Sequence, residues 1–248
     1  MGVLLGAGAL TFIFTTLLTI AGLGAAFILI PVFNGLGVEL YDAMSVALLL
    51  NSIAMIFATI RFSKKKLIMW KTAVPIIIAS IPFSFLGARV AGGIDRDMLR
   101  WFFVGFLLFA AVMMLFYRAK EKEQAQSKGT QIAIGITIGV IAGFVGGLIG
   151  VGGGNMIVPT LVWLGFNPKK ASATTSFIVI FSSFVGFLGH ISSAGLSYSL
   201  LGVTAVASII GALLGAYLMT DKLNKNQVKI LVGIILIAIS AKMIFKLL

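Results

Sequence analysis

Long stretches without any charged residue constrain this chain more than any other feature. They cover residues 1–38, 43–60, 72–88, 101–117, 129–168, 171–220 and 230–241. A helix of about 20 residues crosses the roughly 30 Å hydrocarbon core of a bilayer. Only 10% of the residues are charged, whereas a soluble domain carries about 25%. The sequence therefore predicts an all-α integral membrane protein.

Two of these stretches, 1–38 and 129–168, are too long for one crossing and too short for two full helices and a loop. Each carries a cluster of glycines in its middle and a proline beyond it, and both residue types weaken or break helices. We expect each stretch to form a pair of short helices around a bend, called here a Gly-Pro hairpin. Stretch 171–220 is long enough for two helices, divided by the polar turn near 192–199, and the others suit one helix each.

A constant offset of 128 residues relates the two halves of the chain, as a duplication would. It superposes glycines, prolines and whole tripeptides: Gly22 on Gly150, Gly24 on Gly152, Pro31 on Pro159, Gly37 on Gly165, and Leu86-Gly87-Ala88 on Leu214-Gly215-Ala216. We expect a first membrane repeat over 1–118, a linker over 119–128 and a second repeat over 129–248. Each repeat should hold one Gly-Pro hairpin and three transmembrane helices.

Loop charges indicate that the repeats have opposite orientations. The loop 61–71 carries five basic residues, but its counterpart around 190–199 carries no Lys or Arg. The next pair reverses this pattern, since Asp95 and Asp97 balance one loop and Lys222, Lys225 and Lys229 fill the other. Basic loops stay in the cytoplasm, so we expect inverted-topology repeats in the cytoplasmic membrane. The linker should be cytoplasmic and both termini outside. Inverted repeats are typical of secondary transporters, which hold substrate where the halves meet.

The Gly-Pro hairpins are the candidate site. A helix broken at membrane depth must be buried in protein or line a wet cavity, and its free N–H groups and positive dipole end favour an anion. Close helix packing is the alternative role for these glycines. The substrate-binding residues that we expect are Gly22, Gly24, Asn51, Gly150, Gly152, Gly153, Gly154, Asn155, Thr174, Thr175 and Ser176. Ser182 and Ser183 are weaker candidates.

The acidic residues indicate the charge of the substrate. All seven fall in predicted loops, whereas a cation carrier places Asp or Glu within a span. We therefore expect a small anion as substrate. His190 should lie passively at an outer helix end, and Arg89 should extend toward the interface. With no cysteine and one histidine, we expect no cofactor, no metal site and no catalytic residue. The net charge of +12 lies in short loops and does not indicate nucleic-acid binding.

The duplicated Gly-Pro hairpin, followed by Gly165, Ala171 and the string Ala173-Thr174-Thr175-Ser176, resembles the TauE/SafE family of sulfite exporters. The first half departs from the family pattern at Ala25-Ala26 and Val46-Ala47-Leu48, which shifts the expected site toward the second half. The resemblance implies export of sulfite or an organosulfonate, driven by the proton gradient. An anion channel and an uptake carrier for another oxyanion or carboxylate are the alternatives, and a membrane enzyme is a weaker one. The expected partners are the substrate and the lipid bilayer, with a homodimer left open.

Overall fold

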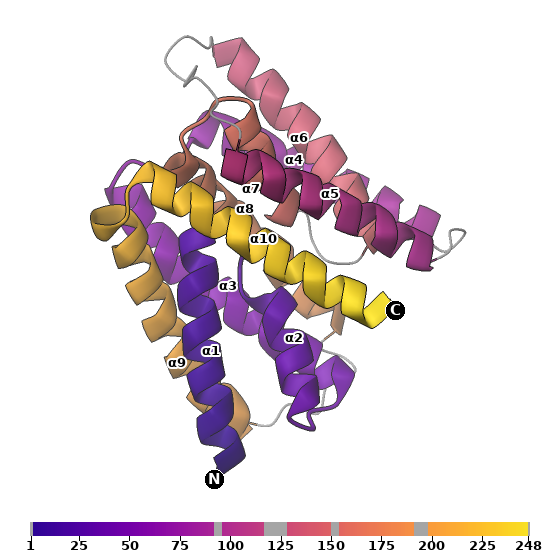
Figure 1. The fold of residues 1–248 in the computed structure, drawn as a ribbon, viewed down its shortest axis with the longest axis vertical. Helices are drawn as coiled ribbons and strands as arrows, with labels where there is room; N and C mark the ends of the chain where they lie inside the picture. Colours follow the sequence, from indigo (N-terminus) through magenta and orange to yellow (C-terminus); the bar gives the residue numbers. More distant parts are fainter. Residues whose placement is uncertain (1, 92–95, 117–127, 150–153, 191–197, 248) are drawn as a thin grey trace.

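The structure is a computed structural model that describes residues 2–91, 96–116, 128–149, 154–190 and 198–247. In these ranges the chain forms helices and no strand (Figure 1), which confirms the expected all-α fold. The helices are α1 (Gly2–Ala21), α2 (Ala26–Gly35), α3 (Leu40–Lys64), α4 (Trp70–Ala91), α5 (Arg96–Phe116), α6 (Lys128–Ile149), α7 (Gly154–Trp163), α8 (Pro168–His190), α9 (Tyr198–Tyr217), the π-helical turn η3 (Leu218–Lys222) and α10 (Lys225–Leu247).

Six of the described helices are long and apolar enough to cross a membrane, namely α1, α3, α4, α8, α9 and α10. Their outward faces carry large apolar side chains that water would not tolerate in such number. Ile78 of α4 is 67% exposed and Phe102 of α5 is 65% exposed. Because lipid is the solvent that accepts these faces, the chain is a multi-pass membrane protein.

The two Gly-Pro hairpins are uneven helix pairs. We expected two short helices in each, but only α2 and α7 are short, at 10 residues, while α1 has 20 and α6 has 22. Pro31 and Pro159 lie inside the short helices, so glycines rather than prolines break the chain at the first bend. Figure 1 shows the chain turning back after α1, so that α2 runs beside it in the opposite direction.

Helix boundaries recur at the 128-residue offset. The first residues of α2 and α7, of α3 and α8, and of α4 and α9 are each 128 positions apart. Both short helices also end in the same turn: Val38 N–H donates to Phe33 O and Phe166 N–H donates to Leu161 O, each at 3.0 Å. The glycine before each donor has φ near +90°, as a Schellman turn requires. These repeated local structures support the duplication.

The halves are interleaved rather than side by side. Helix α4 packs on α6, α1 packs on α9, and α3 packs on α8. A row of glycines on α6 makes the first contact close, because a Cβ added at Gly135, Gly139 or Gly143 would lie 2.6–2.8 Å from a carbonyl oxygen of α4. Small residues bring membrane helices together in this way, so close packing is the role of these glycines.

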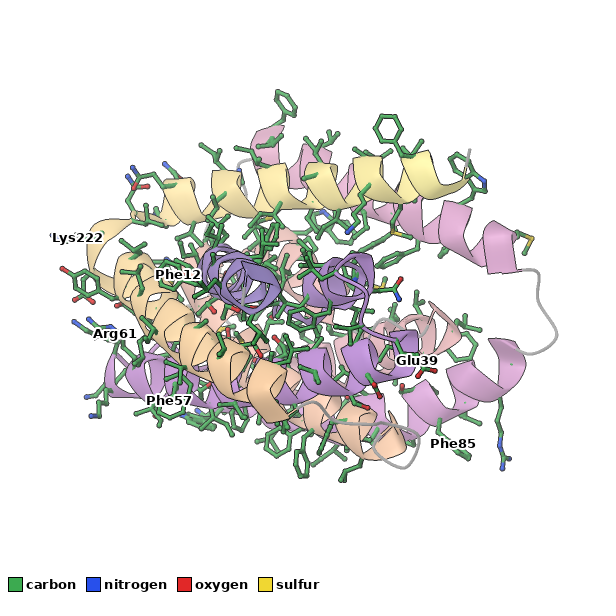
Figure 2. The ribbon with its side chains drawn as sticks, turned by 90° about the horizontal axis from the view of Figure 1, so that it is seen from below. Phe12, Glu39, Phe57, Arg61, Phe85 and Lys222 are labelled. Carbon is green, nitrogen blue, oxygen red and sulfur yellow. The ribbon has the colours of Figure 1, made fainter. Side chains whose placement is uncertain are left out.

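The basic loops gather at one end of the molecule. In Figure 2, Arg61 and Lys222 lie together on one side and Glu39 lies on the opposite side. Figure 1 shows both termini away from the α9–α10 connection. We call the end that contains Arg61, Lys65, Lys169 and Asp221 the basic end.

The expectation that every acidic residue lies in a loop is wrong for three of the described ones. Asp42 lies in the first turn of α3, Asp97 is the second residue of α5, and Asp221 lies in η3. A carboxylate in the first turn of a helix is stabilised by the positive dipole end, and Asp221 is paired with cations. All three lie at helix ends. Asp95, Glu121 and Glu123 lie outside the described residues.

Candidate functional site

The bend between α1 and α2 lies deep in the protein, against α8 of the other half. Gly22 and Gly24 have φ of +74° and +78°, a backbone conformation that side chains other than glycine rarely adopt. Both are buried. A Cβ added at Gly22 would overlap the carbonyl group of Ser172, and one added at Gly24 would lie 2.6 Å from Asn51 Nδ2. Glycine is therefore required here by conformation and by space.

Asn51 of α3 holds this bend in place. Its Oδ1 accepts a hydrogen bond from the N–H of Ala25 at 2.6 Å, at the start of α2. Its Nδ2 donates to Ser183 Oγ of α8 at 2.7 Å. Asn51 is 2% exposed and Ser183 is 5% exposed, so both bonds are shielded from solvent. One amide thus joins the bend, α3 and α8.

The start of α7 reaches the same place from the second half. A Cβ added at Gly154 would lie 2.8 Å from Val179 Cγ2 and 3.5 Å from the carbonyl oxygen of Leu23. Val179 also lies beside Gly24, at 3.0 Å from an added Cβ. The amino ends of α2 and α7 therefore meet beside Val179, between α3 and α8. Gly150, Gly152 and Gly153 lie outside the described residues.

The remaining candidates lie on α7 and α8 and are all buried. Thr175 Oγ1 and Ser176 Oγ donate to carbonyl oxygens one turn earlier in α8, at 2.9 and 3.0 Å. Thr174 Oγ1 instead accepts the N–H of Met69 at 3.0 Å, which ties α8 to the loop before α4. Asn155 is 4% exposed, in the first turn of α7. Thr175 is the hydroxyl residue close to Gly154, with its Cγ2 4.0 Å from an added Cβ.

This arrangement suits an anion-binding site that contains no charged side chain. The first N–H groups of a helix have no acceptor within the helix, and the dipole makes that end positive. Two such ends converge here, and the described residues around them, including Asn51, Val179 and Ser183, carry no formal charge. An anion bound between them would receive backbone N–H donors with no carboxylate nearby to repel it.

One group of polar residues was not anticipated from the sequence. Thr11, Thr15 and Thr19 lie one turn apart on α1 and are fully buried, and their hydroxyls have no hydrogen-bond partner among the described residues. Their spacing of four residues was the available signal. Ser183, considered a weak candidate, is the partner of Asn51. Sequence spacing did not indicate this contact, because 132 positions separate the two residues.

A second unanticipated feature is an ion cluster at the basic end. Asp221 of η3 accepts Arg61 Nη2 and Lys65 Nζ of the α3 end, each at 2.6 Å. Lys169 Nζ of α8 donates to the carbonyl of Thr220 at 2.9 Å. The cluster links α3 of the first half to α8 and η3 of the second.

Two residues singled out in the sequence lie at helix ends outside this cluster. The Arg89 guanidinium lies 4.5 Å from the Phe85 ring centroid, on the exposed last turn of α4. His190 is the last residue of α8.

Comparison with known proteins assigns the chain to a family. The family model for the sulfite exporter TauE/SafE matches residues 7–243. The chain belongs to the TauE/SafE family. It is 27% identical to the probable membrane transporter protein YunE of Bacillus subtilis, over 92% of each chain. It is 28% identical to a probable membrane transporter protein of Methanocaldococcus jannaschii, over 73% of this chain and 70% of that one. No solved structure matches. This TauE/SafE protein is accordingly a membrane transporter, as the sequence predicted.

Proposed function

We propose that this TauE/SafE protein is a secondary transporter that exports a small anion, sulfite or an organosulfonate, through the cytoplasmic membrane. The observation that carries the proposal is the meeting of the α2 and α7 amino ends between α3 and α8. Substrate binds there, near the middle of the membrane, and a proton gradient drives export as the family resemblance implies. The basic end faces the cytoplasm and both termini face outside.

The geometry favours a carrier over a channel. The bend at Gly24 is packed against Asn51 and Val179 on both sides, and the ion cluster joins the two halves at the basic end. Contacts of this kind between halves must break and reform if the site is to open alternately to each side. An anion channel with the same family membership remains the second candidate, and kinetics separate the two.

Counterflow of radiolabelled sulfite in proteoliposomes tests the proposal. We expect unlabelled sulfite on the opposite face to accelerate labelled sulfite entry, which marks a carrier. An unsaturable ohmic current without acceleration would instead indicate a channel. Imposed pH gradients of either sign then measure proton coupling.

A matched pair of alanine substitutions tests the location of the site. Gly24→Ala places a Cβ 2.6 Å from Asn51 Nδ2 on a backbone of φ +78°, whereas Gly202→Ala meets no atom within 4 Å. We expect Gly24→Ala to reduce counterflow by about tenfold or more, which corresponds to about 1.4 kcal/mol, with normal insertion. Gly202→Ala should behave as wild type. Equal transport by both variants would place the site elsewhere.

The chemical class of the substrate is tested separately by thermal stabilisation of the purified protein. A ligand at a hundredfold excess over its Kd stabilises by about 2.7 kcal/mol. We expect sulfite and sulfonates to raise the unfolding midpoint more than acetate or chloride does. A larger effect of carboxylates would retain the anion site and reject the sulfur chemistry.

A further inference from the structure

Three threonines form a row of hydroxyl groups along α1. Thr11, Thr15 and Thr19 are spaced at one helical turn, so they share one face of the helix, and each is fully buried. On the opposite face, Ile13 and Leu17 are 48% and 39% exposed, as side chains that contact lipid are. The threonine row therefore faces the interior of the protein.

The hydroxyls of the threonine row have no hydrogen-bond partner among the described residues. A helical threonine commonly donates to the carbonyl oxygen one turn earlier. Thr16 of α1 does so to Phe12 O at 2.7 Å, and Thr204 of α9 does so to Leu200 O at 2.6 Å. A buried hydroxyl without a partner is costly, and the row repeats this cost at each of its positions. Water or a ligand is the partner that these hydroxyls can still take.

Helix α9 lies beside α1 (Figure 1) and presents glycines to the threonine row. A Cβ added at Gly211 would lie 3.3 Å from Thr15 Cβ, and one added at Gly215 would lie 2.9 Å from Thr19 Cβ. These glycines allow close packing but offer no side-chain acceptor, so no side-chain hydrogen bond joins the helices there. Because α1 belongs to the first half and α9 to the second, their contact lies on a boundary that a carrier can open.

The threonine row leads away from the bend between α1 and α2. Gly22 N–H donates to Thr19 O at 3.1 Å, so one end of the row adjoins the bend. Thr11, at the other end, lies about 12 Å nearer the start of the helix at 1.5 Å per residue. With the amino terminus outside, an exported anion must travel in this direction.

We propose that Thr11, Thr15 and Thr19 line the outer part of the passage through which the anion leaves the bend. Their hydroxyls bond to water and to the anion when α1 and α9 separate. In this structure the passage is closed, since all three side chains are fully buried. Uncharged donors suit a passage, because an anion must leave it as readily as it enters. The inference rests on the proposed export function and adds the route to it.

Replacing the three hydroxyls by methyl groups tests their role. Thr11→Val/Thr15→Val/Thr19→Val keeps the shape of each side chain, and no hydrogen bond to another described residue is lost. We expect the unfolding midpoint in detergent to stay at or above that of wild type, while sulfite counterflow falls by about tenfold or more. Thr16→Val, which removes a hydroxyl bonded within α1, should transport as wild type. A lower midpoint or normal counterflow of the triple variant would assign the row to packing instead.

Chemical labelling tests whether the passage opens, and it requires no transported substrate. The chain contains no cysteine, so Thr15→Cys provides a single thiol. In right-side-out vesicles it should react with external sulfonatoethyl methanethiosulfonate, a small sulfonate that does not cross lipid. Ala111→Cys, fully buried in α5, should remain unreacted.

The two cysteine variants give distinct outcomes. Protection of both thiols, or reaction of both, would overturn the proposed passage. If Thr15→Cys alone reacts but the wild-type protein shows no sulfite counterflow, the passage is supported and the proposed sulfite transport is wrong.

Discussion

Removing the hydrogen bonds of Asn51 is the most demanding test of how the bend between α1 and α2 is held. Asn51→Leu keeps the approximate volume of the side chain and leaves two buried groups without partners, the N–H of Ala25 and the hydroxyl of Ser183. An unsatisfied buried group costs about 1–3 kcal/mol. The two together should lower the free energy of unfolding by about 4 kcal/mol, and the unfolding midpoint by roughly 8–16 °C.

Two serine substitutions calibrate this value. Ser183→Ala leaves only Asn51 Nδ2 unpaired and should cost about 2 kcal/mol. Ser182→Ala changes an exposed neighbour whose hydroxyl bonds its own helix and should stay within about 0.5 kcal/mol of wild type.

A double variant shows whether Asn51 and Ser183 stabilise the protein through one shared contact or independently of each other. Asn51→Leu/Ser183→Ala removes one of the two orphaned groups, so it should unfold no lower than Asn51→Leu alone. Midpoints are measured by following tryptophan fluorescence of detergent-purified protein during heating. Additive losses, or an Asn51→Leu midpoint equal to that of Ser182→Ala, would show that the amide does not secure the bend.

Three further predictions concern the topology, the packing of the halves and the ion cluster. In the naturally cysteine-free chain, Glu39→Cys should react with an impermeant thiol reagent from outside and Ser63→Cys only from inside; both positions are exposed, and labelling of both from one side would refute the inverted topology. Gly143→Ala puts a Cβ 2.6 Å from an α4 carbonyl oxygen and should cost about 1–3 kcal/mol, while Gly202→Ala, in open space, costs less in the same melting assay. Asp221→Asn should leave the unfolding midpoint close to that of wild type, because exposed ion pairs contribute little to stability, but it should accelerate sulfite counterflow by loosening the halves, and an unchanged rate would exclude a gating role for the cluster.

The sequence predicted helix limits well because charges mark helix ends in membranes. The α3–α4 connection lies among the lysines at 64–71, and the α8–α9 connection lies at the polar segment expected near 192–199. The unequal lengths of α1 and α2 were missed. Both the glycines and the proline were expected to break the helix, yet Pro31 lies within α2 and the positive-φ glycines alone make the turn.

Helix partners could not be predicted in the same way. Lipid is as apolar as the helices, so hydrophobicity does not select which of them pair. The four-residue spacing of Gly135, Gly139 and Gly143 is visible in the sequence, but their contact with α4 depends on backbone surfaces that appear only after folding. For the same reason the sequence indicated Asn51 as polar and buried without indicating Ser183 as its partner.

At positions 128 residues apart, the two halves resemble each other more closely in backbone structure than in their polar side chains. The turns after α2 and α7 share their hydrogen bonds, yet Asn51 corresponds to Val179, and Asn155 corresponds to Phe27. Asn51 and Val179 nevertheless flank the same glycine, Gly24. Each half therefore supplies one side-chain amide near the amino ends of α2 and α7, but the two amides come from different elements. A site built there has a symmetric backbone and an asymmetric set of side-chain donors. Such a site can fix the orientation of an asymmetric anion such as a sulfonate, which a lining with two-fold symmetry would bind equally well in two orientations.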